Sequence, residues 1–137
     1  GTQSAGALEQ TLVDLAQVVS DPTPKLILAD ELEAITEPGA GARIIAGMLL
    51  AARAQKDTSM MLVTHLAPAI VKASGCNDLR VDGIEARGLD ANLELIVDRN
   101  PIRNHLAKST PELIVKRLVE RSDGGAKTLF SDILNMF

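Results

Sequence analysis

The sequence predicts an α/β layered fold, because helical and strand patterns alternate along its first half. Residues 25–29 and 59–64 are largely apolar runs without alternation, the pattern of strands buried on both faces of a parallel sheet. One helical pattern precedes the first run, and another separates the two. The chain has 137 residues, enough for one domain with a core, and its apolar fraction of 46% argues against disorder.

Three helices are predicted around these strands. Apolar residues recur at helical spacing over residues 6–19, and a segment with two prolines ends that helix. A break at Pro38-Gly39 precedes a second helix over residues 41–55. Its expected inward side chains are Ile45, Ala46, Leu49 and Leu50. Residues 68–73 indicate a short third helix.

The second half predicts a β-hairpin and then a helix. Residues 79–86 and 92–97 resemble strands, and the glycine and aspartate within residues 87–91 supply turn chemistry between them. A helix is expected over residues 110–121, because its first three residues are a capping threonine, a proline suited to the first turn and a glutamate.

Composition limits the functions that this chain can perform by itself. The net charge of −4 argues against a grip on DNA phosphates, and with two phenylalanines as the sole aromatics base stacking is not expected. A single cysteine, Cys76, excludes an internal disulfide and fits a reducing cytosol. The apolar runs are too short to span a bilayer. Because the sequence begins with Gly1, we expect a piece of a longer protein.

Two adjacent carboxylates, Asp30 and Glu31, follow the first predicted strand. Ligands of open α/β sheets bind at this edge, beyond the carboxyl ends of the strands. Since adjacent strand residues point to opposite sides, one carboxylate can meet Mg²⁺ while the other orients a water molecule for phosphoryl transfer. The alternative is a strand end that enters solvent with two ordinary acids.

Two further polar features accompany these acids. Thr64-His65 ends the second predicted strand, where a histidine could donate to a γ-phosphate, although such a histidine can also be an ordinary strand-end residue. Ser4 stands at the start of the first helix, where a hydroxyl and free backbone N–H groups can bind an anion. A simple helix cap is the alternative for Ser4.

Taken in order, these features resemble the MutS branch of the ABC-type ATPases. The family's signature segment, Ser-Thr-Phe-Met-Val-Glu, is matched at Ser4 and Glu9, and residues 5–8 differ from it. Its magnesium-linked aspartate and catalytic glutamate fall on Asp30 and Glu31.

The rest of the resemblance follows the same order. A loop that is Gly-rich in the family, with Gly-Thr-Ser-Thr, falls on residues 32–39, where only Thr36 matches cleanly. The family's Thr-His switch falls on Thr64-His65. The resemblance extends over roughly residues 3–121, and the divergent loop indicates a distant MutS-like protein.

The resemblance implies a P-loop NTPase-like fold of the ABC/MutS type, with a partial parallel sheet flanked by helices, then a β-hairpin and helices. Residues 1–121 would be the C-terminal half of the ATPase domain. Residues 122–137 would be a linker with a flexible break over residues 122–125 and a helix over residues 126–136. No G-x-x-x-x-G-K-[ST] loop occurs, so the phosphate-binding half is expected upstream. The sheet should therefore have an open edge beside the second strand.

The resemblance also implies cofactors, partners and roles. ATP and Mg²⁺ would bind between two subunits of a homodimer, DNA would bind through other domains, and no membrane would be involved in a cytoplasmic protein. Catalysis would use Glu31 and His65, and the metal would be supported by Asp30. Nucleotide contacts would come from Ser4, Thr36 and Thr64.

Two alternatives remain open from the sequence. The first is another ABC-type ATPase, of the SMC or recombination-repair kind, whose signature is usually Ser-Gly-Gly where this chain has Ser-Ala-Gly. The second is a catalytically silent dimerisation module, which the divergent loop after Glu31 favours.

Overall fold

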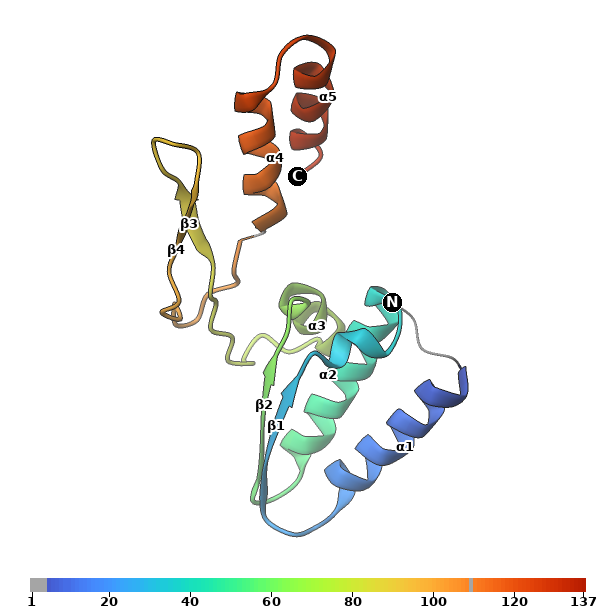
Figure 1. Cartoon of the computed structure of the whole chain (residues 1–137). Coiled ribbons are helices and arrows are strands. Elements are labelled where there is room, and N and C mark those ends of the chain that lie inside the picture. The colour runs from blue at the N-terminus through green and yellow to red at the C-terminus, as the bar shows by residue number, and fades with distance from the viewer. Residues whose placement is uncertain (1–4, 109) are drawn as a thin grey trace. The chain divides into compact units, whose positions relative to one another are not determined.

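The computed structural model describes residues 5–108 and 110–137, and the chain divides into two compact units between Leu79 and Arg80 (Figure 1). The elements of the N-terminal unit are α1 (Ala5–Ser20), β1 (Lys25–Asp30), a short 3-10 helix η1 (Leu32–Ile35), α2 (Pro38–Ala54), β2 (Thr58–Val63) and α3 (Ala67–Ser74). Those of the C-terminal unit are β3 (Ala86–Leu89), β4 (Leu95–Val97), α4 (Thr110–Arg121) and α5 (Gly124–Leu134). The chain is thus α/β, as predicted. No helix in the described ranges is long and apolar enough to cross a membrane.

The two predicted strands of the N-terminal unit are adjacent and parallel. They pair in register from Lys25 with Thr58 to Asp30 with Val63. Within the described residues β2 pairs with β1 alone, so its other edge is open. The prediction of an incomplete sheet is confirmed for this chain, while the wider P-loop fold stays a prediction.

The core of the N-terminal unit lies along α2. The fully buried side chain of Ile45 is surrounded by apolar residues of three neighbouring elements, and in Figure 1 α2 lies between the two strands and α1. The buried cluster and the residues packed on it are Ala42, Ile45, Ala46, Ile70, Leu32, Leu49, Leu62 and Leu66. Helical spacing of small and branched residues therefore places one face of α2 against the sheet.

The opposite face of the two strands is uncovered. Leu26, Leu28, Met61 and Val63 are 63%, 68%, 63% and 63% exposed. Burial alternates strictly along both strands, because successive side chains point to opposite faces and α2 covers one face. The prediction that both strands are buried on both faces is therefore wrong for this chain.

The helix predicted over residues 41–55 begins earlier than expected. Pro38 occupies its first turn instead of breaking the chain, and the backbone oxygen of Glu37 accepts the Gly41 N–H. Proline suits this position because its missing donor would be unpaired there in any case. The segment expected to be a loop is thus shortened, and η1 fills most of it.

In the C-terminal unit, the predicted hairpin exists but its turn was misplaced. Residues expected in the turn, Arg87 to Leu89, belong to β3, and the chain reverses over residues 90–94 instead. The Asp90 carboxylate accepts the backbone N–H groups of Asn92 and Glu94, at 2.8 and 3.0 Å, and fixes this turn. Of the strand expected over residues 79–86, only Ala86 lies in β3, while Gly83 forms an isolated bridge with Ile102.

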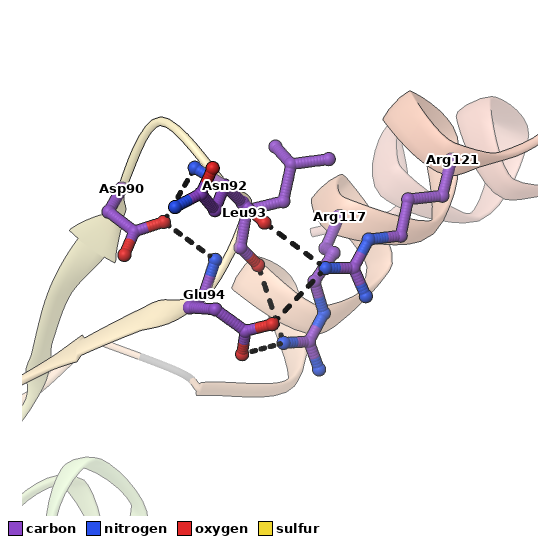
Figure 2. Close-up of polar contacts among 6 residues, drawn as sticks. All are labelled: Asp90, Asn92, Leu93, Glu94, Arg117 and Arg121. Atoms are coloured by element: carbon purple, nitrogen blue, oxygen red, sulfur yellow. Dashed lines mark hydrogen bonds and ion pairs between the residues drawn. The ribbon is translucent and has the colours of Figure 1, made fainter.

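The hairpin tip contacts α4 through two arginines one helical turn apart (Figure 2). Arg117 donates to the Leu93 carbonyl at 3.4 Å, and Arg121 donates to the Asn92 carbonyl at 3.3 Å. Both guanidinium groups also approach the Glu94 carboxylate, at 3.7 and 3.4 Å. These contacts connect the hairpin with the helical pair within one unit.

The last helix also begins earlier than predicted, because Gly124 and Gly125 lie within α5 and the break is confined to Ser122-Asp123. Figure 1 shows α4 and α5 side by side as a helical hairpin. The division of the chain into residues 1–121 and 122–137 stays a prediction for the larger protein.

Candidate functional site at the ends of β1 and β2

A shallow pocket lies where the two parallel strands end. Because Asp30 pairs with Val63 in the last rung of the sheet, the residues that follow each strand emerge side by side. The pocket has a volume of about 250 Å³ and is lined by Glu31, Glu33, Ala34, Thr36, Pro38 and His65. Three of the residues predicted from sequence, Glu31, Thr36 and His65, therefore share one pocket.

The backbone at Glu31 is left-handed, with φ 55° and ψ 32°. A non-glycine residue in this region is uncommon, and Asp57, Leu93 and Asn104 adopt a positive φ outside this pocket. At Glu31 the conformation marks the sharp turn that ends β1. The strand ends at Asp30, so the alternation expected for two strand residues does not extend to Glu31. The two carboxylates are therefore not successive strand residues, and strand alternation does not place them on opposite sides of the sheet. The turn at Glu31 determines the direction of the Glu31 side chain instead.

Hydrogen bonds fix the backbone after β2. The half-buried Thr64 accepts the Leu66 N–H at its hydroxyl oxygen, at 3.0 Å. The His65 N–H donates to Glu33 Oε1 at 2.9 Å, while the histidine side chain is exposed and lines the pocket. The Thr-His pair is therefore held to the segment that follows β1.

Glu33 is the residue of this site that the sequence prediction missed. Burial by itself would raise its pKa, but the His65 N–H, the Glu33 backbone and the Thr64 side chain together hold that pKa below the usual range for glutamate. Glu33 is thus ionised at neutral pH. Its second carboxylate oxygen, Oε2, is buried. The available signal was an acidic residue in a loop that is Gly-rich in the resembled family.

The donor set bears on the predicted magnesium. The described residues contain no group of three or more histidine, cysteine or acidic side chains able to hold a metal ion. Mg²⁺ in nucleotide sites is commonly bound by one or two carboxylates, with phosphates and water as its other ligands. Asp30 is exposed at the end of β1, and neither Asp30 nor Thr64 is among the residues that line the pocket. The role of Asp30 at a magnesium ion stays a prediction. Ser4, the predicted anion-binding residue, lies outside the described residues.

Comparison with known proteins agrees with the residue pattern. The chain is 45% identical over 133 residues to a protein called DNA-binding protein MutS2 from Pyrococcus furiosus. The match covers 97% of this chain but 23% of that relative's length. No protein-family model matches the chain, and no solved structure matches it. Nearly the whole chain is therefore similar in sequence to one segment of a longer MutS-like protein.

Proposed function

We propose that this chain forms part of the ATP-hydrolysing engine of a longer MutS-like protein, called the parent protein below. The observation that carries the proposal is the juxtaposition of Glu31 and His65 in one pocket at the carboxyl ends of adjacent parallel strands. This edge is the usual ligand site of open α/β sheets. The similarity of the sequence to MutS2 supports the same assignment.

Each residue of the site has a proposed task. Glu31 orients and activates the attacking water, and His65 donates to the γ-phosphate. Thr36 and Thr64 supply polar contacts to the nucleotide, and Ser4 approaches the γ-phosphate bound to a second subunit. Asp30 supports Mg²⁺, which when bound would neutralise charge on the phosphates.

In this proposal, another part of the parent protein supplies the phosphate-binding loop of the site. Carboxylates alone repel a polyphosphate, and the chain has no phosphate-binding loop. The open edge of β2 and the exposed apolar face of the sheet provide places for the missing part of the domain. A homodimer of the parent protein would sandwich ATP, and other domains would bind DNA in the cytoplasm.

Two measurements test this function. Calorimetric titration of the isolated chain with Mg-ATP should show no binding, whereas the parent protein should bind and hydrolyse ATP. Micromolar binding by the chain alone would show that the nucleotide site lies elsewhere. A parent protein that dimerises without ATP turnover would instead favour the silent dimerisation module.

A further inference from the structure

The Glu33 carboxylate joins the two strand ends of the candidate site. Glu33 lies in η1, two residues after Glu31, and its Oε1 accepts the His65 N–H from the other strand end, 32 residues away in sequence. Through this bond, the segment that carries Glu31 holds the backbone of His65 directly.

The bond joins a carboxylate to a backbone donor. Hydrogen bonds with an ionised acceptor are stronger than neutral ones, and Glu33 is ionised at neutral pH. The second oxygen, Oε2, is shielded from solvent as well. An acid used only to solubilise the surface would have both oxygens in water, so the location of Glu33 indicates a task within the site.

We infer that Glu33 is a positioning residue, whose carboxylate holds the backbone of His65 at a fixed position relative to Glu31 at the end of the sheet. The consequence for catalysis rests on the proposed ATPase function. The hydrogen bond between the His65 N–H and Glu33, called the Glu33 tie below, does not depend on that function. Movement of the segment after β1 would then shift His65, so the two groups act as one unit.

The tie can be tested in this chain by NMR. The His65 amide proton should shift as Glu33 titrates, with a midpoint below about 4.3, the ordinary glutamate value. The shift should vanish in Glu33→Gln and Glu33→Ala and persist in Glu37→Gln, a matched acid whose side chain caps nothing. Glu31 and His65 are the other titratable groups of the pocket. A His65 amide that behaves alike in wild type and Glu33→Ala, with other amides unchanged, would overturn the inference.

The consequence can be tested in the parent protein. Glu33→Ala should lower kcat by about 10- to 100-fold with little change in ATP affinity, because misplacement of a catalytic group costs rate. Glu33→Gln, which keeps an acceptor for the His65 N–H, should recover much of that loss. An unchanged kcat in Glu33→Ala would refute the positioning role. A wild-type parent without turnover would contradict the proposed function instead, while the amide titration would still decide the tie.

Discussion

At the residue scale, Glu31 combines a strained backbone with the position expected of a catalytic acid. Its left-handed conformation turns the chain out of β1 and into η1. Strain of this kind costs about 1–3 kcal/mol and persists only where the surrounding structure imposes it. Here the surrounding structure is the tie between Glu33 and His65 on one side and the start of α2 on the other.

A second polar cluster, in the C-terminal unit, predicts how stability depends on pH. The Lys108 backbone N–H donates to Glu85 and lowers its pKa, and His105 Nε2, 3.0 Å from Glu85 Oε1, acts in the same direction. A lowered pKa in the folded state stabilises the protein above the unfolded value, near 4.3, and that contribution is lost as pH falls through the folded value.

The expected result is an acid-sensitive C-terminal unit. Hydrogen exchange at the Gly83 and His105 amides should accelerate below about pH 4 in the wild type, relative to its intrinsic pH dependence. In Glu85→Gln, both amides should already exchange faster than in the wild type at neutral pH. The additional acceleration at acid pH should be mostly lost. Glu120→Gln, an exposed acid on α4 outside its first turn, is the control. A Glu85→Gln profile parallel to wild type would show that the cluster contributes nothing.

At the element scale, two glycines predict opposite effects of the same substitution. Gly47 lies exposed within α2, and a Cβ added there meets no atom within 4 Å. Gly47→Ala should stabilise the N-terminal unit by about 0.5–1 kcal/mol, because alanine restricts the unfolded chain and favours the helix. The free energy of opening, from hydrogen exchange at the Ile45 amide, measures the gain.

Gly83 is the matched contrast. A Cβ there would lie 2.7 Å from the His105 backbone oxygen and 3.0 Å from the Ala107 nitrogen. Gly83→Ala should therefore destabilise the C-terminal unit by about 1–3 kcal/mol, measured by exchange at the His105 amide. Equal effects at both glycines would mean that close approach at Gly83 is unimportant.

The elements differ in how well the sequence predicts them. β1 and β2 follow from apolar runs ended by polar residues, and α4 follows from its first three residues. The sequence predicts turn chemistry at both Gly88 and Asp90, but Gly88 lies in β3 and Asp90 accepts the hydrogen bonds that form the turn, so the turn lies later than expected.

Part of the candidate site could not be predicted from the sequence. The proposed roles of Glu31 and His65 follow from strand-end chemistry and the family resemblance, and their shared pocket follows from parallel pairing. The bond from His65 to Glu33 depends on η1, a local conformation with no clear sequence signal. The Glu33 carboxylate lies in a segment that the sequence predicts only as a loop.

At the scale of the whole molecule, the main feature is the uncovered apolar face of the β1–β2 sheet, which a domain that is stable by itself would bury. Leu28 and Met61 are paired neighbours on that face and are more than 60% exposed. Exposed apolar patches and open strand edges promote association. The isolated chain should therefore self-associate as its concentration rises.

A charge pair on this face should suppress that association. Leu28→Lys with Met61→Glu places opposite charges across the strand pair, which favours pairing while removing apolar surface. Sedimentation velocity should show a more monomeric protein with unchanged helix content. Val13→Lys with Val18→Glu, on exposed positions of α1, is the control. If only the control reduced association, the contact surface would lie on α1.

Glu31, the acid that follows β1, is proposed to activate the water that attacks ATP in the parent protein, and one comparison tests this role most directly. Glu31→Gln should lower the rate of ATP hydrolysis by about 10²- to 10⁴-fold, the usual contribution of a general base, and leave ATP affinity nearly unchanged. Glu37→Gln, six residues further on, should hydrolyse ATP at close to the wild-type rate. Wild-type turnover in Glu31→Gln, or an equal loss in Glu37→Gln, would contradict the claim.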